Sequence, residues 1–182
     1  MAKKKSQMGM ILNIALIVLS VLTICTLFMP IIKSATVVTD IAETATGADV
    51  FSAAFAKEAS SEMTGGANLL YGMRTADENS FVAVVMMWAY MLTVLVSVAT
   101  LVFAVLGLLG MRFKLVNTIL GAALVVLALV TFIFALIVAS KNTSITEVLG
   151  KETGVRTSAM ITAYLMFASM IAGGLQVYKT RV

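Results

Sequence analysis

Four long apolar runs alternate with short or polar segments along the chain. They cover residues 8–32, 81–110, 115–139 and 158–178, and none contains Asp, Glu, Lys or Arg. About 20 apolar residues in a helix cross a hydrocarbon core of roughly 30 Å. The pattern therefore predicts an all-α membrane protein, a four-helix antiparallel bundle that forms a single integral membrane domain over residues 1–182.

The first run follows Lys3–Lys5, so a secretory signal peptide is the alternative to a membrane span. A signal has an apolar region of only about 7–15 residues, and no small-x-small cleavage site follows this run. We therefore expect the segment to remain as a transmembrane helix. Pro30 should end or bend that helix, because its ring removes a backbone donor.

The second run has 30 residues and could reach roughly 45 Å, so we expect it to tilt or to project beyond the bilayer. Only Met111–Lys114 separates it from the third run. This short cationic turn predicts that the two helices form an antiparallel hairpin.

Residues 33–80 and 140–157 are the two polar loops, and we expect them to form a small outer cap. Ile31–Thr39 is rich in β-branched residues, which favours a short strand. Asp49–Met63 has apolar residues four apart, which predicts an amphipathic helix that ends at the glycines of 64–66. In the second loop, Ser144–Glu147 matches a capping box and predicts one turn of helix.

The stripe on the predicted loop helix is the first candidate interface. Its main residues are Phe51, Phe55 and Met63. Such a stripe could cover the chain's own helix bundle, lie at the lipid interface, or bind a neighbouring subunit.

Composition and charge support a membrane class and give an orientation. The chain is 60% apolar and 12% charged, against about 25% charged in soluble domains. All nine acids lie in the two loops, whereas the other three polar segments carry seven basic residues: Lys3, Lys4, Lys5, Arg112, Lys114, Lys179 and Arg181. The positive-inside rule then predicts a multi-pass cell-membrane protein with both termini in the cytoplasm. The net charge of +4 reflects this topology, and we expect no nucleic-acid binding.

The sequence offers no catalytic constellation, so we expect no enzyme, no cofactor and no metal. The chain has no histidine, and Cys25, its only cysteine, lies in the first run, where we expect a small core residue. The spans lack the ionisable groups that pumps and ion-coupled carriers use. Met87 and Met91, and Met166 and Met170, have the spacing of a Cu(I) ladder, although methionine also fills gaps between helices.

Small residues four apart in the fourth run form the second candidate interface: Ala168, Ser169, Ala172 and Gly173. They allow close approach of another helix, either within one bundle or between subunits. Polar residues in the spans could bond across helices or, in an oligomer, line a pore. These uses remain open from the sequence.

Four spans with inner termini, a long first outer loop and a short second loop resemble claudin-type tetraspan proteins. The resemblance implies an outer sheet pinned by a disulfide. The family's first-loop tryptophan and cysteine pair are absent here, because Trp88 lies in the second run and the loop has no cysteine. No family residue is carried over.

Two functions fit these features. The first is a non-enzymatic structural or assembly subunit that acts through its outer loops and helix faces, as a homo-oligomer or in a larger membrane complex. The second is a passive oligomeric channel, whose acidic outer mouth would draw in cations.

Overall fold

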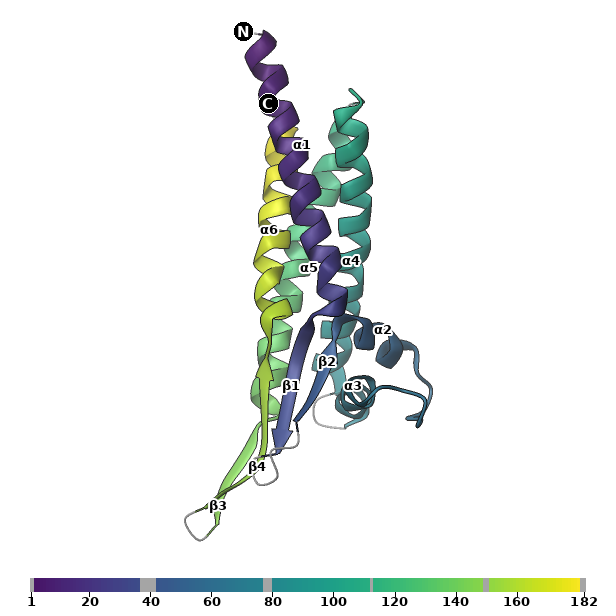
Figure 1. The fold of residues 1–182 in the computed structure, drawn as a ribbon, viewed down its shortest axis with the longest axis vertical. Helices are drawn as coiled ribbons and strands as arrows, with labels where there is room; N and C mark the ends of the chain where they lie inside the picture. The colour runs from purple at the N-terminus through teal and green to yellow at the C-terminus, as the bar shows by residue number, and fades with distance from the viewer. Residues whose placement is uncertain (1, 37–41, 77–79, 112, 149–150, 181–182) are drawn as a thin grey trace. The chain divides into compact units, whose positions relative to one another are not determined.

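A computed structural model describes the fold of residues 2–36, 42–76, 80–111, 113–148 and 151–180. The side chains of residues 2–6 and 144–153 lie outside this description. The described residues form six α-helices, one 3₁₀ turn and four strands (Figure 1).

Four helices are long and apolar enough to cross a membrane, by length and composition. They are α1 (Ala2–Cys25), α4 (Ser80–Leu108), α5 (Lys114–Lys141) and α6 (Ile161–Lys179). The four predicted helices are thus confirmed. The first apolar segment leaves the α-helix before Pro30, through the 3₁₀ turn η1 (Thr26–Phe28), and Pro30 begins strand β1.

The chain divides into two compact units. Unit 1 comprises residues 1–25, 92–129 and 165–182, and unit 2 comprises residues 26–91 and 130–164.

Unit 1 has a small apolar core to which all four long helices contribute. Leu16, Ala104, Leu124 and Ala172 form its buried centre. Two of the helices pack backbone to backbone in this unit: a Cβ on Gly121 would lie 2.6 Å from the Gly173 carbonyl oxygen, and a Cβ on Gly173 would lie 2.5 Å from the Gly121 carbonyl oxygen. Only glycine allows α5 and α6 to approach this closely.

Polar side chains of unit 1 point inward and large apolar side chains point outward. Thr100 Oγ1 donates to Gln176 Oε1 at 3.0 Å, and Gln176 Nε2 donates to Asn117 Oδ1 at 3.3 Å. Thr23 and Ser169 share a hydrogen bond of 2.7 Å. The exposed side chains include Ile11, Ile14, Val18, Leu95, Val98, Val102, Ile119, Val126 and Ile171. This distribution is the reverse of a water-soluble domain and suits a hydrocarbon solvent.

A glycine ends α4 at the turn that joins it to α5. Gly110 has φ +90°, its N–H donates to the Gly107 carbonyl at 3.2 Å, and the Met111 N–H donates to the Leu106 carbonyl at 3.1 Å. This pair of bonds is a Schellman motif, in which glycine supplies the left-handed conformation.

Unit 2 contains one antiparallel sheet built from both polar loops. Its strands are β1 (Pro30–Thr36), β2 (Ala42–Thr46), β3 (Ser144–Val148) and β4 (Lys151–Ala159), in the order β2-β1-β4-β3. Strand β1 pairs with β2 on one side and with β4 on the other, where Ile32 opposes Ala159 and Thr36 opposes Val155. The two loops therefore fold as one body. Helices α2 (Gly47–Phe55) and α3 (Gly65–Thr75) contact the β2 side of this sheet (Figure 1).

Several expectations for the loops are wrong in detail. The chain is not purely helical, because the sheet is larger than the possible short strands expected from the first loop. The second loop forms the hairpin β3–β4 in place of a helical turn, and β4 extends to Ala159, inside the predicted fourth span. In the first loop the predicted helix 49–63 ends already at Phe55. The glycines of 64–66 begin α3, which was not predicted, because Thr64 caps that helix by accepting from the Ala67 N–H at 3.1 Å.

Candidate functional site

A buried carboxylate joins α2 to α3 in unit 2. Asp49 is 8% exposed and accepts hydrogen bonds from the Thr46 N–H at 2.7 Å, from Thr46 Oγ1 at 2.8 Å and from Thr64 Oγ1 at 2.5 Å. Thr46 and Thr64 are the N-cap residues of α2 and α3. One side chain thus fixes the starts of both helices, which uses its acceptors structurally and leaves it little capacity for chemistry.

An arginine fixes the other end of α2. Arg74 donates to the Ala54 carbonyl at 2.6 Å and to the Ala56 carbonyl at 2.5 Å, and its guanidinium lies 4.9 Å from the Tyr71 ring centroid. A cation at the C-terminus of a helix satisfies the last carbonyls and the helix dipole. The helices α2 and α3, here called the cap, are therefore joined at both ends of α2 and contact strand β2.

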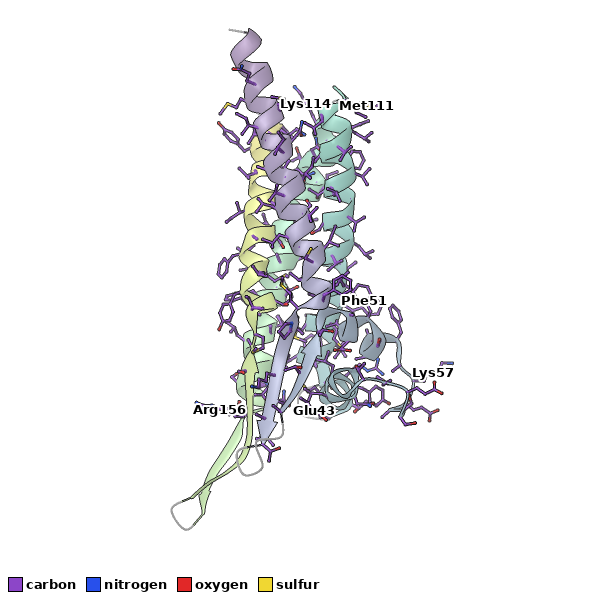
Figure 2. The ribbon with its side chains drawn as sticks, in the orientation of Figure 1. Glu43, Phe51, Lys57, Met111, Lys114 and Arg156 are labelled. Atoms are coloured by element: carbon purple, nitrogen blue, oxygen red, sulfur yellow. The ribbon has the colours of Figure 1, made fainter. Side chains whose placement is uncertain are left out.

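The outward surface of this cap carries aromatic residues. Helix α2 buries Gly47, Asp49, Val50 and Ala53, so Phe51 is half-buried and Phe55 is 67% exposed. Phe55 meets Trp88 of α4 edge to face, with ring centroids 5.7 Å apart. Figure 2 shows Phe51 on α2 and Lys57 beyond the end of this helix. Met63 lies outside α2, so the predicted stripe does not form one helical face.

The small residues of α6 pack within unit 1. Ser169 is buried against Thr23 of α1, Ala172 belongs to the apolar core, and Gly173 lies on the Gly121 backbone of α5. Ala168 is half-buried. Packing inside one chain accounts for the spacing of these residues, and their use between subunits stays a prediction.

The hairpin β3–β4 extends beyond the rest of the sheet as a two-stranded ribbon. Strand β4 pairs with β1 only over Val155–Ala159, whereas its pairing with β3 covers Lys151–Val155 (Figure 1). Within the part of the chain that the structure describes, no strand pairs with the free edge of β3 or with the opposite edge of β4 at 151–154. Sequence reasoning missed this feature, because the capping-box pattern of Ser144–Glu147 favoured a helix.

The described residues bring together no set of side chains typical of catalysis or of metal binding. No group of three or more His, Cys, Asp or Glu side chains among them could hold a metal ion. Cys25 is exposed, so its expected place in the core is wrong. Met87, Met91 and Met166 are buried, as gap-filling methionines are.

Comparison with known proteins gave no relative: no family model, no curated protein and no solved structure matches the chain. The resemblance to claudin-type proteins therefore rests on the arrangement of apolar segments alone.

Proposed function

We propose that the protein is a multi-pass membrane protein that acts as a structural or assembly subunit through unit 2, which contains both polar loops. The distribution of side chains supports insertion. Every polar residue described within the apolar part of α4 is buried, whereas Leu92, Leu95 and Val98 are more than 40% exposed. Such a surface would aggregate in water and is compatible with lipid.

The aromatic residues indicate where the outer bilayer boundary lies. Trp88 is 46% exposed and Tyr164 is 52% exposed, and both rings are of the type that anchors spans at headgroup level. From Trp88 to Leu108 the helix has about 21 residues, or roughly 31 Å, which matches a hydrocarbon core. On this placement the start of α4, where Ala83, Met86 and Met87 are fully buried, stands outside the bilayer with the sheet and the cap.

The ribbon of β3 and β4 is the observation that carries the assembly proposal. An isolated two-stranded hairpin is marginally stable in water. No described strand pairs with the outer edge of β3, and the N–H and C=O groups of such an edge readily pair with a strand of another chain. A second copy of this chain offers the same edge, and antiparallel β3–β3 pairing would join two sheets into one across a twofold axis.

Shortening the ribbon tests this route. We replace residues 146–153 by the dipeptide Asn-Gly, which suits a two-residue hairpin turn and leaves the β1–β4 pairing at Val155–Ala159 intact. We expect the native protein to assemble in mild detergent and the shortened variant to dissociate to a chain of about 19 kDa, with unchanged helical circular dichroism.

Two comparison variants sharpen the result. Lys57→Gln changes an exposed residue of unit 2 and should leave the mass unchanged. Phe55→Glu disrupts the exposed aromatic surface instead. If Phe55→Glu loses assembly and the shortened variant keeps it, the ribbon is not the interface, and α2 is.

The passive channel receives less support. Polar residues that would line a pore between subunits are instead buried inside unit 1 of a single chain, as Thr100, Asn117 and Gln176 are. The exposed faces of the same helices are apolar. A ring of subunits packed through those faces would leave a pore without polar lining.

A further inference from the structure

A cavity of about 570 Å³ lies in unit 1 near the turn between α4 and α5. All four long helices line it. The polar side chains on its wall are Asn13, Lys114, Asn117, Lys179 and Thr180. Its size falls within the range of about 300–1,000 Å³ that small-ligand sites have.

The polar wall is organised around Lys179. Its Nζ donates a hydrogen bond to Asn13 Oδ1, and the Asn13 side chain is only 4% exposed. Gly107 provides the space for this pair: a Cβ there would lie 2.8 Å from Asn13 Oδ1 and 2.8 Å from Lys179 Nζ. The packing of α1, α4 and α6 therefore holds an ammonium group at the cavity wall.

Unit 1 offers this ammonium no acidic side chain. Unit 1 contains seven basic residues and neither an aspartate nor a glutamate. Asn13 satisfies one donor of Lys179 but carries no charge, and the lysine is half-buried. A charge withdrawn from water is stabilised by a counter-charge, so the site favours an anion from outside the chain.

Apolar side chains also line the cavity. Leu108, Met111 and Phe113 line it and are 43%, 51% and 38% exposed. Figure 2 shows Met111 and Lys114 together at this end of unit 1. A ligand that matches both the polar and the apolar side chains carries a negative group and a hydrocarbon part.

We propose that this cavity binds the phosphate group of an anionic phospholipid. Lys179 and Lys114 contact the phosphate as point charges, the Asn117 amide nitrogen donates a hydrogen bond, and the glycerol and acyl chain lie along the apolar side chains. Basic pockets between spans recognise lipid headgroups in this way. The proposal rests on membrane insertion and does not depend on assembly.

Native mass spectrometry of the full chain in mild detergent tests the site with three probes: phosphatidylglycerol, phosphatidylcholine with the same acyl chains, and inorganic phosphate. We expect one phosphatidylglycerol retained per chain and no retention of phosphatidylcholine. Lys179→Gln should weaken phosphatidylglycerol retention about tenfold or more, because it removes the charge and keeps a donor for Asn13. Lys114→Gln should weaken it as well.

Lys57→Gln, in unit 2, serves as the matched control and should retain the lipid as the native protein does. Displacement of phosphatidylglycerol by millimolar inorganic phosphate would support the phosphate site and make a free anion its ligand. Equal retention of both lipids would overturn the proposal, and so would unchanged retention in Lys179→Gln and Lys114→Gln when both variants keep native helical content. A chain that binds phosphatidylglycerol as a monomer would leave this site standing while the assembly proposal fails.

Discussion

Gly173→Ala is expected to destabilise the protein by about 1–3 kcal/mol or more. The added Cβ would lie 2.5 Å from the Gly121 carbonyl oxygen and 3.0 Å from the Val125 N–H nitrogen. Both are backbone atoms, which no side-chain rotation can move away. Accommodation therefore requires α5 and α6 to separate, with loss of contacts around the apolar core of unit 1.

The adjacent glycine provides the matched control. A Cβ on Gly174 would meet nothing within 4 Å, so Gly174→Ala should be neutral or should stabilise α6 by up to about 1 kcal/mol through helix propensity. Unfolding of both variants is followed by circular dichroism during titration with a denaturing detergent. An equal response of the two positions would contradict the close packing of α5 on α6.

Gly66→Ala is expected to release α3 from the sheet in unit 2. The new Cβ would lie 2.4 Å from the Thr44 carbonyl oxygen, 2.7 Å from the Ala45 Cα and 2.7 Å from Asp49 Oδ2. Two of these atoms belong to the backbone of β2, and the third belongs to the carboxylate that fixes both cap helices. We expect amide exchange in α2, α3 and β2 to rise by at least about tenfold, which corresponds to about 1.4 kcal/mol of local stability.

Gly65→Ala is the control for this second substitution. Its Cβ would approach only the Glu43 side chain, at 3.5 Å, which is an ordinary contact. Hydrogen exchange measured by mass spectrometry should show native protection in this variant. Loss of protection in Gly65→Ala but not in Gly66→Ala would contradict the docking of α3 on β2.

The sequence predicted the long helices well, because each is a charge-free run longer than a hydrocarbon core requires. Their limits shifted where the apolar pattern did not report backbone geometry. Residues 26–32 are apolar, yet the chain there passes through η1 into β1. Likewise, Ser158 and Ala159 resemble the start of a span but pair with β1.

Unit 2 was predicted less well, because several of its elements depend on contacts distant in sequence. Gly65 and Gly66 follow an apolar helical pattern and suggested a helix end. Their actual place at the start of α3 depends on Thr64 as the N-cap, on the Asp49 carboxylate and on close approach to β2. Only the Thr64 cap is local in sequence, and the other two contacts have no local sequence signal.

The candidate interfaces show the same limit. Spacing identified the small residues of α6 as a close-packing surface, and Gly173 does lie against a neighbouring backbone. Spacing could not tell whether that backbone belongs to the same chain. The ribbon of β3 and β4 was missed entirely, because a capping-box motif and a β-hairpin both accommodate Ser, Thr and Glu.

The mass of the native protein, taken from its membrane in mild detergent or a lipid nanodisc, tests the assembly role most directly. We expect a particle that contains two or more chains of 19.3 kDa, or one chain within a larger membrane complex. A single chain without a protein partner, at every protein concentration measured, would contradict it.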